Sequence, residues 1–340
     1  MRRQTGYDWL GNLDSITQFV LGAAIAEATL GRRVGRRAAL IGGIVASLPD
    51  LDVLVPFADP VSDFTYHRSA SHSLLVLVLF APLVAWMIDR CFVPERRNFR
   101  SWWLCCSLAL VTHPLLDAFT VYGTQLAWPL SEHPYGLGSM FIIDPVYTLP
   151  LIAAVLVAQF SRARTVKWNA TALALTSAYL ALSVVVQAHV ETLVRQELQR
   201  KQIPAIAVGV HTTPFNIVAW RILVTDPSGY RVGYYSLWAP RPIEFERYAS
   251  APRLLDDIAE TWPVARLAWF TKGLNAVSEQ DGAVVLSDLR MGLEPNHYVF
   301  AFRLGERVAG RTQAAQVTRV APAPYVAADW ARLRQRIFGP

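Results

Sequence analysis

Long apolar segments separated by short polar loops fill the first 190 residues of the chain. Six segments are mostly apolar: 15–30, 38–57, 73–89, 102–119, 139–160 and 169–190. A membrane-spanning helix needs about 20 mostly apolar residues, with a range of about 17–25. The pattern therefore predicts a membrane α-helical bundle of about five to six apolar helices.

Two of these segments are less regular than the others. The first, 15–30, is short and carries Glu27, so it fits a spanning, a re-entrant or an interfacial helix equally. The second contains Leu48-Pro-Asp-Leu-Asp52, and a proline inside a helix removes a backbone hydrogen-bond donor. We expect the second helix to bend or break at Pro49.

After residue 190 the pattern changes to short stretches of ordinary globular composition. Asp226-Pro-Ser-Gly229 has the composition of a hairpin turn. Alternation with a period of two predicts strands, and apolar residues at helical spacing predict a helix. The expected strands are 217–224, 230–238, 284–286 and 298–304, and the expected helix is 252–273.

These patterns divide the chain into two domains. Residues 1–190 form a transmembrane helical domain, and residues 191–340 form a small extramembrane α+β domain with an arginine-rich tail. The composition agrees, because 53% apolar residues, only 17% charged residues and a mean hydropathy of +0.28 are untypical of a soluble enzyme. Asp8 and Asp14 interrupt what would be the apolar core of a signal peptide, so we expect no cleaved leader.

The positive charge is concentrated in alternate loops. Each of the loops 31–37, 90–101 and 161–168 carries three or four basic residues, whereas 58–72 and 120–138 contain only Arg68 between them. Basic loops stay in the cytoplasm, so this distribution places the other two loops and the C-terminal domain on the non-cytoplasmic side. It also argues against a nucleic-acid-binding face, which would gather its basic residues on one surface.

The same orientation gathers acids and histidines at the outer ends of the segments. They are Asp50 and Asp52, His67 and His72, His113 and Asp117, and Asp144, with Asp14 and Gln18 from the N-terminal segment. Three histidines with at least three acids make up the inventory of a hydrolytic site with one or more metal ions. Zinc suits the histidines best, and a manganese or magnesium ion would suit the acids.

Local spacing gives each pair two interpretations. His113 and Asp117 share one face of a helix, as two ligands of one ion or as a polar pair that satisfies itself at a helix end. Asp50 and Asp52 point the same way in an extended chain and would complete a mixed nitrogen and oxygen site, or they cap a helix. Asp144 precedes Pro145, which fits a helix cap as well as a ligand.

The loop between the second and third segments carries His67-Arg-Ser-Ala-Ser-His72. Five residues advance about 140° beyond a full helical turn, so the two histidines meet at one ion only from an irregular loop. Arg68 between them is suited to clamp a phosphate or carboxylate group. A solvated polar loop is the alternative. No glycine-rich phosphate loop and no Gly-x-Ser-x-Gly motif occurs in the sequence.

Five motifs occur in an order that resembles a known family. They are Asp14-Ser-Ile-Thr-Gln18, Pro49-Asp-Leu-Asp52, His67-Arg-Ser-Ala-Ser-His72, Thr112-His-Pro-Leu-Leu-Asp117 and Gly123-Thr-Gln125. The chain resembles bacterial inner-membrane metal-dependent hydrolases of the YdjM type, and Trp220-Arg221 and Asp288-Leu-Arg290 extend the likeness. The resemblance implies a membrane-bound hydrolase with Asp50, Asp52, His67, His72, His113 and Asp117 at its metal site. Where the family often has a histidine this chain has Gln18, for which we expect a hydrogen-bonding role.

The leading hypothesis is an integral membrane metal-dependent hydrolase of the bacterial inner membrane. Its site would lie at the outer interface and act on a lipid-like or membrane-associated phosphoester, with Asp50, Arg68 and Asp117 as catalytic candidates. Arg68 would hold the anionic group and one acid would act as general base. The alternatives are an ion- or proton-linked transporter and a membrane-anchored binding or structural protein that holds a structural metal.

Overall fold

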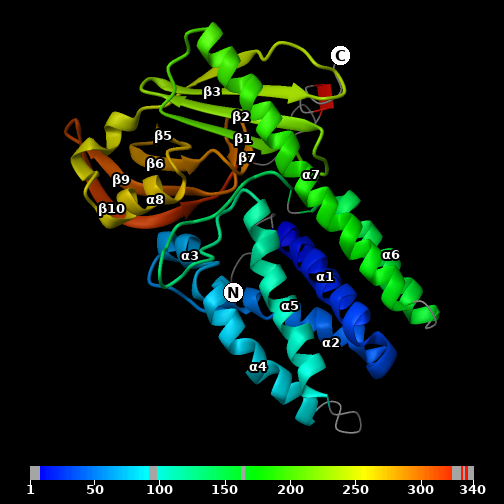
Figure 1. Cartoon of the computed structure of the whole chain (residues 1–340). Helices are drawn as coiled ribbons and strands as arrows, with labels where there is room; N and C mark the ends of the chain where they lie inside the picture. The colour runs from blue at the N-terminus through cyan, green and yellow to red at the C-terminus, as the bar shows by residue number, and fades with distance from the viewer. Residues whose placement is uncertain are drawn as a thin grey trace. The chain divides into compact units, whose positions relative to one another are not determined.

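The computed structural model describes residues 8–91, 98–141, 143–161, 165–323, 331 and 334–335. The chain forms two compact units. The first contains residues 1–55, 68–184 and 214–216, and the second contains residues 56–67, 185–213 and 217–340. The first unit is built from helices, and the second contains the β-sheets (Figure 1).

The helical unit is organised around its first helix, which contacts three of the others. Its elements are α1 (Asp8–Val34), α2 (Arg37–Ala46), η1 (Pro49–Leu54), η2 (Ala70–His72), α4 (Leu74–Cys91), α5 (Phe99–Phe119), α6 (Pro145–Phe160) and the first part of α7 (Thr165–Arg200). α1 packs against α2, α5 and α6, and α5 also packs against α4 and α2. The core between them is made of small and aliphatic side chains, including Ala24, Leu30 and Leu110.

The backbones of α1 and α2 approach each other closely because glycines face each other across the contact. A Cβ atom on Gly22 would collide with Ala46 and with the backbone of Gly42, and a Cβ on Gly42 would collide with Ala26. Small residues at a helix crossing let two helices pack at short range. This contact fixes the C-terminal end of α2, and therefore the start of η1, against α1.

Three of the described helices are long and apolar enough to cross a membrane: α4, α5 and α7. The expectation of five to six apolar spanning helices was therefore too high. α2 has only ten residues, a rise of about 15 Å against a hydrocarbon core of about 30 Å, because the chain breaks at Pro49 as expected. α6 has 16 residues, and α1 is long but carries Glu27, Arg32 and Arg33.

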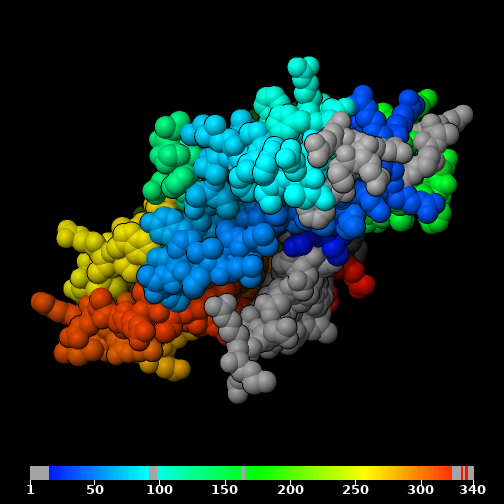
Figure 2. Space-filling model, turned by 90° about the horizontal axis from the view of Figure 1, so that it is seen from below, coloured from blue at the N-terminus to red at the C-terminus, as the bar shows by residue number. Residues whose placement is uncertain are grey.

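The surface of the helical unit is apolar where α4 lies. Figure 2 shows this helix, in light blue and cyan, on the visible face of the molecule. Leu75, Val78, Leu79 and Leu83 are exposed along it. Such a surface is the one a spanning helix presents to lipid.

One buried acid lies within the helical unit away from the other acids. Glu27 of α1 is fully buried and accepts hydrogen bonds from Gln159 Nε2 (3.1 Å) and Thr165 Oγ1 (2.8 Å). A buried carboxylate is tolerated when hydrogen bonds replace the lost hydration. Glu27 thus joins α1 to the end of α6 and the start of α7.

The second unit contains two four-stranded antiparallel sheets and a small two-stranded one. Their orders are β1-β2-β3-β4, β10-β9-β6-β5 and β7-β8. The strands are β1 (Ala207–Thr212), β2 (Ala219–Asp226), β3 (Gly229–Ser236), β4 (Phe245–Ala249), β5 (Asn275–Gln280), β6 (Ala283–Asp288), β7 (Gly292–Leu293), β8 (His297–Tyr298), β9 (Ala301–Val308) and β10 (Arg311–Val320). The other elements of this unit are α3 (Pro60–Tyr66), η5 (Pro252–Ile258), α8 (Trp262–Phe270) and the end of α7.

The strands expected at 217–224, 230–238 and 284–286 correspond to β2, β3 and β6, whereas the strand expected at 298–304 is divided between β8 and β9. Asp226 pairs with Gly229 in the β2–β3 hairpin, so the predicted turn is confirmed. The single helix expected at 252–273 is instead η5 followed by α8, because Pro263 lies in the first turn of a new helix. Most of the arginine-rich tail described by the structure is strand β10.

We predict that Gly42→Val destabilises the helical unit. The added side chain has no space against α1, and overpacking of this kind costs about 1–3 kcal/mol. Thermal unfolding in detergent measures the effect as a lower Tm. Leu40→Ala, at an exposed position on the same helix, serves as the control and should leave Tm nearly unchanged. Equal stability of the two variants would contradict the role given to the glycine contact.

Candidate metal centre

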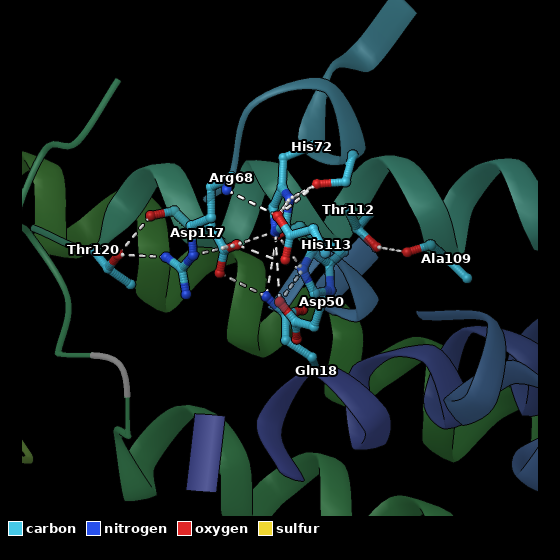
Figure 3. Close-up of polar contacts among 11 residues, drawn as sticks. Gln18, Asp50, Arg68, His72, Ala109, Thr112, His113, Asp117 and Thr120 are labelled. Atoms are coloured by element: carbon cyan, nitrogen blue, oxygen red, sulfur yellow. Dashed lines mark hydrogen bonds and ion pairs between the residues drawn. The ribbon is translucent and has the colours of Figure 1, made fainter. Parts of the chain in front are cut away.

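Four side chains from three elements converge on one point in the helical unit. Asp50 comes from η1, His72 from η2, and His113 and Asp117 from α5 (Figure 3). Each offers one donor atom, and these atoms all lie within 4.8 Å of one another. The side chains of His72 and His113 are 0% exposed and that of Asp117 is 1% exposed, whereas that of Asp50 is 23% exposed.

Five of the six separations between the donor atoms are close to those of a tetrahedral metal site, and the sixth, between Asp50 and Asp117, is within 4.8 Å. His72 Nε2 and His113 Nε2 lie 3.2 Å apart. Asp50 Oδ1 lies 3.5 Å from His72 Nε2 and 3.3 Å from His113 Nε2, and Asp117 Oδ2 lies 3.3 Å and 3.5 Å from the same two atoms. Four ligands at bond lengths of about 2.0–2.1 Å in a tetrahedron are about 3.3–3.4 Å apart. The residues present therefore fit a metal ion of this size.

Helical spacing places two of the ligands. His113 and Asp117 are four residues apart on α5, and both point to the same face of the helix, as the sequence predicts. Pro114 lies between them without ending the helix. Gln18 of α1 donates from Nε2 to Asp117 Oδ1 (2.9 Å) and to the carbonyl oxygen of His113 (3.2 Å). The hydrogen-bonding role expected for Gln18 is thus present, and it leaves Oδ2 of Asp117 facing the histidines.

Asp52 is not one of the four donors, but it orients His72 through Ser71. Its Oδ2 accepts a hydrogen bond from Ser71 Oγ (2.7 Å). Since the single hydroxyl hydrogen of Ser71 is used there, Ser71 Oγ, 2.9 Å from His72 Nδ1, accepts from the Nδ1–H group. His72 Nε2 then carries the lone pair that faces the centre. Outer hydrogen bonds of this kind fix the tautomer of a metal-binding histidine.

Arg68 is buried beside the centre in a strained backbone conformation. Its φ is 63°, in the left-handed region that non-glycine residues rarely adopt. Its backbone N–H donates to Asp52 Oδ2 (3.0 Å), and its carbonyl oxygen accepts from the backbone of Gln125 (2.9 Å). Its guanidinium Nε lies 3.3 Å from Asp117 Oδ2, and Nη1 donates to Thr120 Oγ1 (3.4 Å). These contacts hold the strained turn in place.

Three other candidates lie outside the group of four donors. His67 ends α3, where its backbone N–H donates to the carbonyl oxygen of Asp63 (3.3 Å). Asp144 caps α6, since its Oδ1 accepts from the backbone of Val146 (2.8 Å) and its Oδ2 from the Tyr179 hydroxyl (2.7 Å). Asp14 belongs to α1, but its side chain lies outside the described part of the structure.

The comparisons with known proteins identify the family of this chain. The family described as "YdjM inner membrane protein" matches residues 13–190, which include all four donor residues. The chain belongs to the YdjM inner membrane protein family. The resemblance found in the sequence motifs is therefore confirmed, and so is the membrane character of the protein.

Two curated proteins show how far the likeness to individual relatives extends. YfhP of Bacillus subtilis (strain 168) is 28% identical over 228 residues, which cover 65% of this chain and 68% of YfhP. The inner membrane protein YbcI of Escherichia coli (strain K12) is 35% identical over 105 residues, 29% of this chain and 57% of YbcI. No solved structure matches the chain.

In this YdjM family member the charges around the donors favour a cation. Asp50, Asp52 and Asp117 face one arginine, Arg68, so the site has two negative charges in excess when both histidines are neutral. Burial alone would raise the pKa of Asp50, but hydrogen bonds with His113 and His72 hold it well below its usual range. Burial would lower the pKa of His72, but hydrogen bonds with Asp117 and Asp50 raise it to about 9. Asp50 thus stays charged, and a metal ion competes with a proton at His72.

The sequence analysis assigned no role to Ser71, although this residue lies within the motif at 67–72. Its hydroxyl joins Asp52 to His72, and its position next to the histidine was the only indication in the sequence. Thr120 is a second such residue, since it accepts from Arg68 and donates to the carbonyl oxygen of Asp117. Both act on donor residues through hydrogen bonds.

We predict that His113→Ala removes most of the bound metal, because it deletes one of two nitrogen donors at a buried site. Inductively coupled plasma mass spectrometry of protein purified in mild detergent without chelator measures the metal content. His189→Ala, at an exposed histidine of α7, is the matched control and should keep the metal content of the unsubstituted protein. Equal metal in both variants would contradict the assignment.

We also predict that Ser71→Ala weakens metal binding by about 10-fold or more, since loss of an orienting group around a metal-bound histidine has an effect of this size. Competition with a chelator of known affinity gives the Kd. Ser131→Ala removes a serine hydroxyl at an exposed loop position and should leave the Kd unchanged. The role assigned to Ser71 is wrong if the two variants bind metal equally well.

Proposed function

We propose that this protein is an integral membrane metal-dependent hydrolase that acts on a lipid-like or membrane-associated phosphoester. The observation that carries the proposal is the convergence of two imidazoles and two carboxylates at tetrahedral separations in a membrane protein. Zinc is the proposed metal, because nitrogen donors and four-fold geometry suit it best. The basic loops 31–37, 90–101 and 161–168 support a site on the non-cytoplasmic side.

The four donors differ in their access to solvent, and this difference suggests their roles. His72, His113 and Asp117 are almost completely buried and would hold the ion. Catalytic zinc sites have three protein ligands and a fourth position open to water or substrate. Asp50 stands at the fourth position and is the only one of the four that reaches the surface. We therefore propose that Asp50 gives up this position to water and then acts as the general base.

The reaction would be addition of water across a phosphoester bond. The oxygen of water bonds to phosphorus, the bond between phosphorus and the alcohol oxygen breaks, and the proton taken by Asp50 ends on the departing alcohol. A divalent ion held by the donors would lower the pKa of a bound water molecule and polarise the phosphoryl oxygen. The Arg68 guanidinium, 3.3 Å from Asp117 Oδ2, lies where it would attract the anionic phosphate and also holds Asp117 in position.

A structural metal is the second candidate, and the closed set of four protein donors favours it. Structural zinc sites have four protein ligands and no open position. In that case Asp50 would be a permanent ligand, and the metal would join η1 and η2 to α5. The two roles of Asp50 predict opposite effects of Asp50→Asn on the metal content.

For the hydrolase we predict that Asp50→Asn retains the metal but loses at least about 100-fold in kcat, the usual contribution of a general base. Hydrolysis of the p-nitrophenyl phosphodiester of a long-chain alcohol by the metal-loaded protein in mixed micelles measures the rate, and mass spectrometry measures the metal. Asp59→Asn, a helix-capping acid of α3, is the control and should retain both. Loss of metal in Asp50→Asn, or absence of hydrolysis in the unsubstituted protein, would support the structural role instead.

A further inference from the structure

The segment that carries Asp50 is itself apolar and exposed. Leu51, Val53, Leu54 and Val55 are 53%, 70%, 74% and 54% exposed. Residues three apart share one side of a 3₁₀-helix, so Leu51 and Leu54 lie together on the surface of η1. Single exposed apolar residues are ordinary, but four large ones within five residues form a surface that indicates contact with an apolar partner.

Lipid is the partner that the surrounding chain indicates. On α2, Leu40 and Ile44 are exposed four residues apart, on one face of the helix that leads into η1. No charged residue occurs between Arg37 and Asp50, so this face of α2 is uncharged up to the start of η1. In a membrane protein, an uncharged apolar helix face of this kind contacts acyl chains.

The exposed donor of the metal centre is next to this apolar surface in the chain. Asp50 is the donor that reaches the surface, and Leu51 follows it directly in the chain. The donors on η2 and α5 are closed off by burial. A molecule that reaches the centre at Asp50 arrives at the residue that precedes Leu51 in the chain.

We propose that η1 lies in the bilayer and forms the route by which a membrane lipid reaches the metal centre. The inference rests on the proposed function and names the substrate class: an amphiphile with a phosphate-containing head and at least one long apolar chain. The head would meet the donors and Arg68, and the chain would lie along Leu51 and Leu54. Water-soluble phosphoesters lack the part that this surface binds.

The position of η1 is tested by nitroxide labelling of Leu54→Cys in vesicles of phosphatidylethanolamine and phosphatidylglycerol. Cys91 is replaced by serine, since it is the exposed native cysteine and the other two are buried. Leu79→Cys on α4 is the lipid reference, and Asp281→Cys in the β5–β6 turn is the aqueous reference. We expect the label at Leu54 to match Leu79, with high accessibility to oxygen and low accessibility to a water-soluble nickel chelate. A label that behaves as at Asp281 overturns the proposal, whether or not the protein is a hydrolase.

The route itself is tested by loading the protein with Mn²⁺ in the same vesicles and measuring ³¹P relaxation of the phospholipid heads. We expect faster relaxation than with His113→Ala, which lacks the ion. The double variant Leu51→Asn/Leu54→Asn should keep its Mn²⁺ and lose most of this enhancement, whereas Leu40→Asn should keep both. The lipid route is overturned if the unsubstituted protein shows no enhancement of ³¹P relaxation. It is also overturned if the double variant shows the same enhancement as the unsubstituted protein. Enhancement without phospholipid hydrolysis would overturn the hydrolase and leave lipid access standing.

Discussion

Two imidazoles and three carboxylates gathered around one point, three of the five groups fully buried, need a positive charge, and the structure around them depends on that need. Arg68 supplies one such charge, and it lies against Asp117. The two Nε2 atoms, 3.2 Å apart, face each other with carboxylate oxygens on either side. Buried charges are stable only when paired or bound to a metal. A cation between these four donors satisfies all of them at once.

The helical unit can be understood as the support of this arrangement. The glycine contact between α1 and α2 brings the end of α2 against α1, and the break at Pro49 turns Asp50 toward α5. Gln18 of α1 then fixes Asp117. The strained backbone of Arg68 binds Asp52, which orients His72 through Ser71. Asp117 and His72 thus each have a second contact that determines where the ligand atom points.

The sequence predicted what depends on local spacing and missed what depends on packing. His113 and Asp117 could be paired because a helix brings residues four apart to one face. His67 and His72 could not be told apart, because an irregular loop has no period, and His72 is the one whose Nε2 meets His113. The spans were overcounted because α2 and α6 are apolar but short. Strands β1, β4, β5 and β10 were missed because most of their side chains are not buried, so no regular apolar alternation marks them.

The unequal burial of the donors is what separates a catalytic centre from a structural one in physical terms. A structural ion gains most when all its ligands are enclosed, since enclosure prevents their exchange with water. Here three ligands are enclosed, and the fourth, Asp50, begins an exposed segment of leucines and valines. A site that served only to hold a structural metal would gain nothing from placing its one accessible donor next to exposed apolar side chains. The same asymmetry is useful to a centre whose substrate arrives from the bilayer.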